Sequence, residues 1–167
     1  RNLLVEPVDD PDEARPIESG VSRTYPSGDF TAQPQPGWVV DKATVAALSE
    51  HPNTLFLDAR ARERYEGRVE PIDARPGHIP GARSAPFAEN LGLDGRFLSP
   101  AALRARYVAL GVDGAETVVA YCGSGVTACH DILALRLAGR GDVLLYEGSW
   151  SDWAADASLP AALGVEN

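Results

Sequence analysis

Cys122 is the residue of this chain whose surroundings are best suited to chemistry. It ends an apolar run and opens the loop of AYCGSGVTACH, residues 120–130, which contains two glycines and a threonine. Glycines allow the tight path that lets successive backbone N–H groups surround the sulfur, and the positive end of a following helix adds to them. A free thiol has a pKa near 8.5, so a decrease of about two units would ionise most of it at neutral pH. The loop therefore predicts a nucleophilic thiolate at Cys122.

Two reaction classes use a cysteine in a loop of this kind. Phosphatases of the tyrosine class need an arginine six residues after the cysteine to clamp phosphate, and that position is Ala128 here. Sulfur-transfer enzymes need only backbone donors around the terminal sulfur of a persulfide. The alternative is an inert buried cysteine, which is common among free cysteines. The order strand, Cys, Gly-x-Gly, helix favours a functional thiol and sulfur transfer.

Two neighbours of Cys122 in the sequence are predicted to have structural roles. Cys129 shares a helical spacing with Ile132 and Leu133 and is expected to pack, and His130 on the same helix is expected to be structural. The three histidines are far apart in the sequence, so no metal site is expected. No organic cofactor is implied either.

Four further residues are interpreted as structural. His78 is expected to tie backbone together in the turn GHIPGA, and Asp58 to hydrogen-bond its own turn or an arginine. Trp150 and Trp153 are expected to anchor packing.

The elements that could position Cys122 alternate along the chain from Asp41 onward. Capping residues, a first-turn proline and terminal glycines mark the helices, and short apolar runs mark buried strands. The predicted helices are DKATVAALSE from residue 41, residues 99–110, VTACHDILALRLAG closed by Gly139, and SWSDWAAD from residue 149; the predicted strands are NTLFLDAR up to Asp58, ETVVAYC and DVLLYEG. This alternation predicts an α/β fold with a parallel sheet flanked by helices on both faces. Ligands of such sheets bind beyond the carboxyl ends of the strands, where Cys122 stands.

Composition excludes some classes of partner. Lys and Arg number 15 and Asp and Glu 24, which gives a formal charge of −9 and argues against nucleic acid. No run of 18 apolar residues is present, so no membrane span is expected, and no signal peptide is recognised. Two cysteines form no disulfide framework, which favours a reducing, cytoplasmic setting.

The first part of the chain differs from the rest. Six of the thirteen prolines fall within residues 1–37, so we expect an N-terminal arm or inter-domain linker there, with one extended piece at NLLVEPV. A disordered tail is the alternative, although Phe30 and Trp38 argue against it. The catalytic domain is predicted at 38–167. Because the chain lacks Met and begins with Arg1, a longer translated product is expected.

Several motifs resemble those of the 3-mercaptopyruvate sulfurtransferases of the rhodanese superfamily. CGSGVTACH is similar to their active-site loop, LDAR, RY, GHIPGA and PF follow the order of their first motifs, and YEGSWSDW is similar to their closing motif. The resemblance covers residues 38–160 and implies a rhodanese-like fold. Members commonly have two tandem domains, and this chain resembles the second, catalytic one.

The resemblance also implies roles for individual residues. Cys122 would be the nucleophile and persulfide carrier, and Ser124 would take part in a relay whose histidine and aspartate come from a first domain, missing here or made as a separate chain. Arg64 in RERY would bind the substrate carboxylate, and Arg75 in VEPIDARPGHIPG would replace a second arginine of an EPR segment. Surface charge is the alternative for both arginines. The cradle around the sulfur would come from Gly123, Gly125, Val126 and Thr127.

The predicted activity is sulfur transfer from 3-mercaptopyruvate, through a Cys122 persulfide, to a thiol such as thioredoxin or to cyanide. Thiosulfate enzymes of the superfamily typically carry basic residues directly after the cysteine, which suit a dianion. The loop GSGVTA carries no charge, so a monocarboxylate donor fits better. Two alternatives remain open: thiosulfate as the donor, and a persulfide carrier or interaction module without turnover of its own.

Overall fold

The computed structural model describes residues 28–29, 31–32 and 36–165 of the 167 in the chain. The strands are β1 Val39–Val40, β2 Thr54–Asp58, β3 Arg83–Ser84, β4 Thr117–Tyr121 and β5 Leu144–Tyr146. The α-helices are α1 Lys42–Leu48, α2 Arg62–Tyr65, α3 Pro100–Ala109, α4 Val126–Leu137 and α5 Ser149–Ala155, and two 3₁₀ turns are η1 Phe87–Asn90 and η2 Val112–Gly114.

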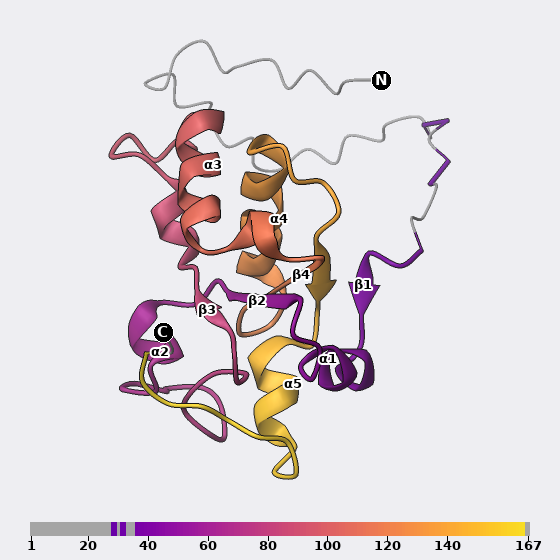
Figure 1. Cartoon of the computed structure of the whole chain (residues 1–167), viewed down its shortest axis with the longest axis vertical. Helices are drawn as coiled ribbons and strands as arrows, with labels where there is room; N and C mark the ends of the chain where they lie inside the picture. The colour runs from indigo at the N-terminus through magenta and orange to yellow at the C-terminus, as the bar shows by residue number, and fades with distance from the viewer. Residues whose placement is uncertain (1–27, 30, 33–35, 166–167) are drawn as a thin grey trace, which may run out of the picture. The chain divides into compact units, whose positions relative to one another are not determined.

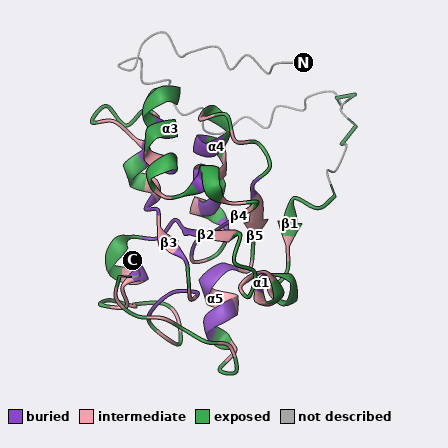
Figure 2. Cartoon of the chain, viewed as in Figure 1, coloured by how far each residue is buried: buried purple, intermediate pink, exposed green. Residues whose placement is uncertain are grey.

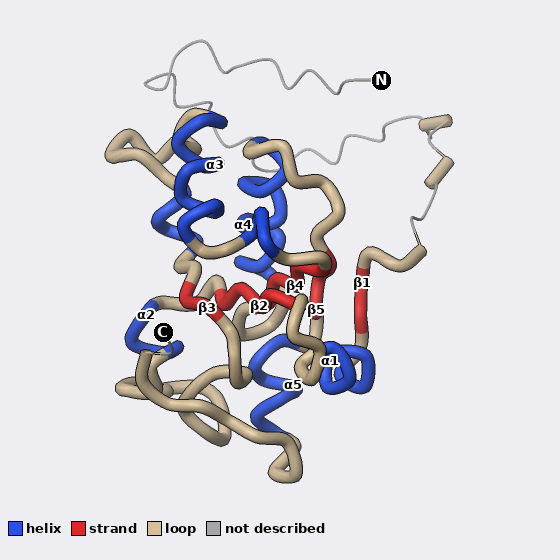
Figure 3. Tube along the Cα trace, viewed as in Figure 1, coloured by secondary structure: helices blue, strands red, loops and turns tan. Residues whose placement is uncertain are grey.

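The strands form one parallel sheet in the order β1-β5-β4-β2-β3. Helices α3 and α4 lie on one face of this sheet, and α1, α2 and α5 lie on the other (Figure 1). Figure 3 shows the strands, in red, as a layer between the two groups of helices. The predicted α/β class, with a parallel sheet covered on both faces, is confirmed.

The central strand β4 explains why both faces need a cover. Its residues alternate between two buried clusters: Val118 and Ala120 face α3 and α4, whereas Val119 and Tyr121 face α1, α2 and α5. A strand buried on both sides is apolar throughout, which is the continuous run seen in the sequence. Figure 2 shows buried residues, in purple, on α4 and α5. Fully burying one large apolar side chain contributes about 1.5–3 kcal/mol.

The capping signals in the sequence act as predicted. The carboxylate of Asp41 accepts a hydrogen bond from the Thr44 N–H at 2.9 Å, and the Ser99 hydroxyl accepts one from Ala102 N–H at 3.3 Å. Gly139 ends α4 with φ +95°, a left-handed conformation that favours glycine. The four predicted helices and three predicted strands are all confirmed.

The shortest elements were missed by sequence reasoning. β1 and β3 have two residues each and α2 has four, too few for any period to be recognised. The segment NLLVEPV and Phe30 lie outside the described residues, as does most of the predicted arm 1–37, so the boundary at residue 38 stays a prediction. Trp38 joins the sheet, because its carbonyl accepts a hydrogen bond from Leu145 N–H at 2.8 Å.

The described residues were compared with what a membrane-spanning helix and a metal site would need. Within the part of the chain that the structure describes, none of the helices has the length and apolar character that crossing a membrane requires. Over those same residues, no three His, Cys, Asp or Glu side chains gather where they could hold a metal ion.

The topology creates a crevice beside β4. The loop after β2 leads to α2 on one face of the sheet, and the loop after β4 leads to α4 on the other face. Because β2 and β4 are neighbours, their outgoing loops separate and leave a gap at the carboxyl ends of the strands. Cys122 is the first residue after β4, so this gap is where its chemistry would take place.

Candidate active site

Cys122 lines a pocket of about 320 Å³ at this gap. The loop after β4 and the residues after β2 form its centre, and other segments add the remaining walls. The lining residues are Arg60, Ala61, Arg64, Ile72, Phe87, Cys122, Gly123, Ser124, Val126, Thr127 and Ser151. Ile72 and Val126 are each 74% exposed, which gives the pocket an apolar rim. A concave site with few convergent polar groups is typical of small-molecule binding.

The pKa of the Cys122 thiol lies below its ordinary value. Burial raises this pKa, but hydrogen bonds to the sulfur from the Thr127 hydroxyl and from the N–H groups of Ala128, Ser124 and Thr127 lower it by more. These donors come from the loop and the first turn of α4, where N–H groups have no partner within the helix. The direction is the one that the loop sequence predicts, and it favours the nucleophilic thiolate.

Gly125 has a different role from the predicted one. Its N–H donates to the hydroxyl of Ser149 at 3.0 Å, so this amide supports the loop rather than a ligand. The residue has φ +81°, and a Cβ there would lie 2.9 Å from the carbonyl oxygen of Glu147. Gly125 is therefore needed for the tight approach of the loop to the end of β5, and the structure corrects its assignment to the substrate cradle. Gly123, Val126 and Thr127 do line the pocket.

Ser149 is a residue of the site that sequence reasoning did not single out. It is fully buried, and its hydroxyl accepts hydrogen bonds from the N–H groups of Cys122 and Gly125, both at 3.0 Å. The same hydroxyl donates to the carbonyl oxygen of Tyr146 at 2.9 Å. Its φ of +55° is unusual for a residue with a side chain. Ser149 thus fastens the cysteine loop to the end of β5.

Ser124 stands in the pocket wall as an exposed residue, and its N–H donates to the Cys122 sulfur. Its predicted place in a hydroxyl–histidine relay needs groups beyond this domain. That role stays a prediction.

Arg64 lies in the wall of the same pocket. Its Nη2 donates to Glu70 Oε1 at 2.7 Å and to Asp73 Oδ2 at 2.9 Å, and its side chain is 19% exposed. Its Nη1 is 3.6 Å from the point where a Cβ on Gly123 would stand, so the guanidinium lies beside the cysteine loop. This placement suits the predicted contact with a substrate anion.

A second arginine of the pocket, Arg60, was not predicted. Its Nη2 donates to Asp58 Oδ2 and to the carbonyl oxygen of Gly77, both at 2.6 Å, and its Nη1 lies 3.3 Å from Glu70 Oε2. The predicted bond of Asp58 to an arginine is thus confirmed. Burial raises the pKa of Glu70, but the hydrogen bond from Arg64 and two backbone N–H groups lower it below its ordinary value.

Arg75 is not brought to the pocket. Its guanidinium donates to the carbonyl oxygens of Ala154, Leu159, Trp153 and Asp156 at 3.0 to 3.2 Å. These carbonyls belong to the last turn of α5 and the segment after it, where helical carbonyls have no partner within the helix. The structure therefore places Arg75 as a cap of α5, and the proposed substrate site omits it.

Cys129 corrects another prediction. It is exposed rather than packed, with its thiol donating to the carbonyl oxygen of Gly125 at 3.3 Å. The helical spacing shared with Leu133 predicted that Cys129 would be packed. Leu133, one turn further along α4, is itself 48% exposed, so this spacing does not mark a buried face of the helix. His130 is half-buried, and its ring stacks on Phe97 with centroids 4.4 Å apart.

The remaining structural predictions are confirmed. His78 is buried, stacks on Tyr65 with ring centroids 3.8 Å apart, and exchanges two backbone hydrogen bonds with Ala162. Trp150 and Trp153 are fully buried in the core.

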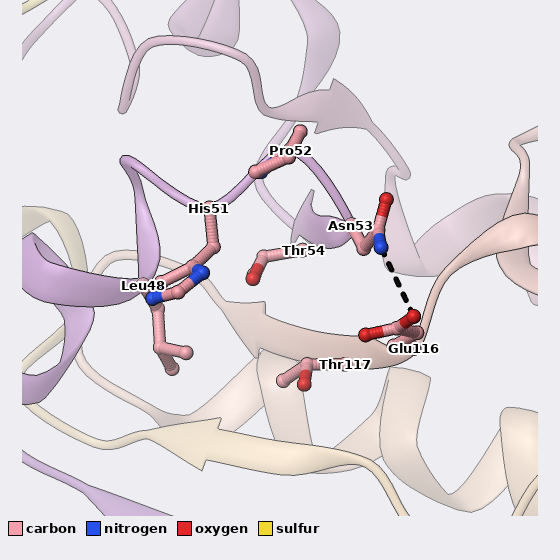
Figure 4. A pocket seen from close by; sticks show the side chains of 7 residues that line it. All are labelled: Leu48, His51, Pro52, Asn53, Thr54, Glu116 and Thr117. Carbon is pink, nitrogen blue, oxygen red and sulfur yellow. Dashed lines mark hydrogen bonds between the residues drawn. The ribbon is translucent and has the colours of Figure 1, made fainter.

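A second hollow of about 280 Å³ lies at the amino ends of β2 and β4, whereas Cys122 follows the carboxyl end of β4. The side chains of His51, Asn53 and Glu116 line it, and Asn53 Nδ2 donates to Glu116 Oε1 at 3.0 Å (Figure 4). It holds no nucleophile comparable to Cys122, and its carboxylate already has a hydrogen-bond partner. The pocket at Cys122 is therefore the candidate active site.

Comparison with solved structures agrees with this fold. The anaerobic ergothioneine biosynthesis enzyme from Chlorobium limicola superimposes with a TM-score of 0.71 over 78% of this chain and 33% of the other, at 22% sequence identity. At that identity the likeness concerns the fold alone.

Comparison of sequences is more specific. A Pseudomonas aeruginosa protein named "Probable 3-mercaptopyruvate sulfurtransferase" is 50% identical over 150 residues, 89% of this chain and 52% of that protein. The 3-mercaptopyruvate sulfurtransferase of Mus musculus is 39% identical over 140 residues, 83% of this chain and 47% of that protein. The chain thus spans about half the length of the curated relatives it matches. The family described as Rhodanese-like domain matches residues 41–156, and the chain belongs to this family.

Proposed function

We propose that this domain is a sulfurtransferase that takes sulfur from 3-mercaptopyruvate onto Cys122 and passes it to a thiol or to cyanide. One observation carries the proposal: the Cys122 sulfur is surrounded by donors that lower its pKa, in a pocket that also contains Arg64. The names of the relatives agree with this activity.

In the first half-reaction the Cys122 thiolate attacks the sulfur of the donor. A sulfur–sulfur bond forms, the carbon–sulfur bond of 3-mercaptopyruvate breaks, and the electron pair of that bond moves to the carbon as the enolate of pyruvate. The proton of the donor thiol then passes to this carbon, so pyruvate leaves and Cys122 carries a persulfide anion. Arg64 would hold the donor carboxylate meanwhile, and the Ser124 hydroxyl would serve the proton transfer.

In the second half-reaction an acceptor thiolate or cyanide attacks the terminal sulfur of the persulfide. The bond between the two sulfurs breaks, and its electron pair returns to Cys122 as the thiolate. Donors from Ser124, Thr127 and Ala128 suit both states, because thiolate and persulfide anion place negative charge near the same N–H groups.

The partners follow from this chemistry. We propose a small anionic sulfur donor, a thiol acceptor such as thioredoxin, and a first rhodanese domain, in the same or a separate chain, that completes the relay at Ser124. A reducing, cytoplasmic setting fits, since both cysteines are free thiols.

The test is the intact mass of the protein after incubation with 3-mercaptopyruvate, with thiosulfate in parallel. We expect a gain of one sulfur atom, about 32 Da, in the native chain and none in Cys122→Ser, because the persulfide forms on that sulfur. Cys129→Ser is the matched control and should load like the native chain. If thiosulfate adds sulfur and 3-mercaptopyruvate does not, thiosulfate is the donor. If neither compound adds sulfur to the folded protein, this domain does not carry out the reaction by itself.

A further inference from the structure

The two cations of the pocket are embedded in a larger number of carboxylates. Arg60 contacts Asp58 and Glu70, and Arg64 contacts Glu70 and Asp73. The three carboxylates are at most 5% exposed, so solvent screens their charges little. Two positive and three negative charges leave this group with a formal charge of −1, although it forms the wall against which an anionic donor would bind.

The hydrogen-bonding capacity left for a donor is small. Arg60 uses all three nitrogens on Asp58, Glu70 and Gly77. Arg64 uses Nη2 on two carboxylates, while its Nε is buried without a hydrogen-bond partner among the described residues. Of the nitrogens of these two arginines, Arg64 Nη1, which lies beside Gly123, is therefore the one left to bind a ligand.

Asp73 differs from the other two carboxylates of this group. Asp58 is bound by the fully buried Arg60, and Glu70 accepts from two backbone N–H groups, so both hold the fold together. Glu70 also binds Arg60 and Arg64, but the Asp73 carboxylate is held by side chains of the pocket wall: Oδ2 accepts from Arg64, and Oδ1 accepts from the Ser151 hydroxyl at 2.5 Å. Its charge thus lies directly behind the surface that a donor touches.

We propose that Asp73 is the specificity-determining residue of the pocket: held by Arg64 and Ser151, its negative charge admits monoanionic sulfur donors and disfavours dianions such as thiosulfate. This inference rests on the proposed function. A fixed negative charge repels a dianion twice as strongly as a monoanion at the same distance, and the single Arg64 site cannot offset both charges. Asp73 acts on the donor through Arg64 and through its field, so it is a positioning residue and not a catalytic one.

The first experiment measures kcat/KM for thiosulfate and for 3-mercaptopyruvate in the native chain and in Asp73→Asn. We expect the ratio of thiosulfate to 3-mercaptopyruvate to rise about tenfold, the effect of one additional unit charge at pocket distance in a partly screened site. Asp73→Glu, which keeps the charge, should leave the ratio within about twofold of native. Asp113→Asn is the matched control, because it removes the same charge at an exposed pair with Arg104 away from the pocket.

A second experiment needs no sulfur transfer. In a Cys129→Ser background, Cys122 is alkylated by iodoacetate, an anion, and by iodoacetamide, a neutral reagent of the same shape. Asp73→Asn should raise the ratio of the iodoacetate rate to the iodoacetamide rate about threefold or more, because less negative charge repels the anion, and Asp113→Asn should not. If the native chain transfers no sulfur but this ratio rises, the proposed function fails while the charge effect stands.

An unchanged ratio in both experiments, with the melting temperature of Asp73→Asn close to native, would overturn the inference. If Asp73→Asn does not fold, Ser151→Ala releases Oδ1 of Asp73 without removing a charge. This variant should then lower the ratio of kcat/KM for thiosulfate to kcat/KM for 3-mercaptopyruvate or leave it unchanged. An increase in this ratio would contradict the inference.

Discussion

At the scale of single residues, the chemistry depends on what surrounds one sulfur atom. Burial alone would keep Cys122 protonated at neutral pH, because a thiolate is poorly solvated in a pocket. The Thr127 hydroxyl is the strongest of the opposing contributions, ahead of the backbone N–H groups of Ala128 and Ser124. The thiolate is therefore stabilised by a side chain in the first turn of α4 as well as by backbone N–H groups.

We predict that Thr127→Val raises the pKa of Cys122. The hydroxyl donates to the thiolate, so its loss destabilises the charged form by about 1 kcal/mol and moves the pKa up by up to about one unit. The rate of Cys122 alkylation against pH, in a Cys129→Ser background, gives this pKa as its midpoint. Thr117→Val, at the other end of β4, is the control and should leave the midpoint in place. An unchanged midpoint in Thr127→Val would show that the hydroxyl does not reach the sulfur.

At the scale of elements, the active loop is held by three segments that meet at Ser149. The hydroxyl at the start of α5 binds the end of β4 and the loop before α4, and it also binds the end of β5. Trp150 N–H and Ser151 N–H donate to the carbonyls of Cys122 and Gly123 at 2.9 and 3.1 Å. The start of α5 therefore sets the path of the cysteine loop as firmly as the loop's own glycines do.

Ser149 offers a test that separates its hydroxyl from its backbone. Ser149→Ala leaves the N–H groups of Cys122 and Gly125 buried without an acceptor and should lower the free energy of unfolding by about 2–3 kcal/mol. Ser149→Gly loses the same bonds but accepts φ +55° freely, so it should be about 1 kcal/mol more stable than Ser149→Ala. Urea unfolding gives both values, with exposed Ser158→Ala as the near-neutral control. Equal stability of the Ala and Gly variants would refute a backbone contribution.

At the scale of the whole molecule, the chain has a formal charge of −9 and buries the carboxyl group of Asp131, which forms no ion pair within 4 Å among the described residues. Burial raises the pKa of Asp131 to about 7, against smaller lowering contributions from Asn90, Arg106 and Tyr107. Its Oδ1 accepts from Asn90 Nδ2 at 2.7 Å, and Oδ2 has no hydrogen-bond partner among the described residues. The folded molecule therefore keeps a proton that the unfolded chain releases near pH 4.

This difference makes stability depend on pH. Between about pH 4 and pH 7 the unfolded state has lost the Asp131 proton and the folded state has not, so the free energy of unfolding falls as pH rises through this window. The loss reaches on the order of 4 kcal/mol above pH 7. Asp131→Asn should remove that part of the slope and be more stable than native at pH 8. Urea unfolding at several pH values measures it, with Asp113→Asn as control; an identical slope in Asp131→Asn would contradict the assignment.

The sequence by itself determined the class of fold and the central residue. The long apolar strands, the caps at Asp41 and Ser99, and the glycine after α4 are local signals, and each produced the element predicted. The loop after Cys122 is local too: its donors lie within six residues of the sulfur, so their direction could be read from the spacing.

Only the tertiary structure decided which distant side chains join that loop. Ser149 binds the N–H of Gly125, 24 residues away in the sequence, and Asp73 binds the Ser151 hydroxyl, 78 residues away, and no period or motif encodes such pairings. Arg75 is the opposite case. Its positive charge suggested that it binds the substrate anion, but in the folded chain its guanidinium binds carbonyl oxygens at the end of α5. A buried polar group must find a hydrogen-bond partner. Which partner a charged side chain such as Arg75 meets is decided only when the sheet brings distant segments of the chain together.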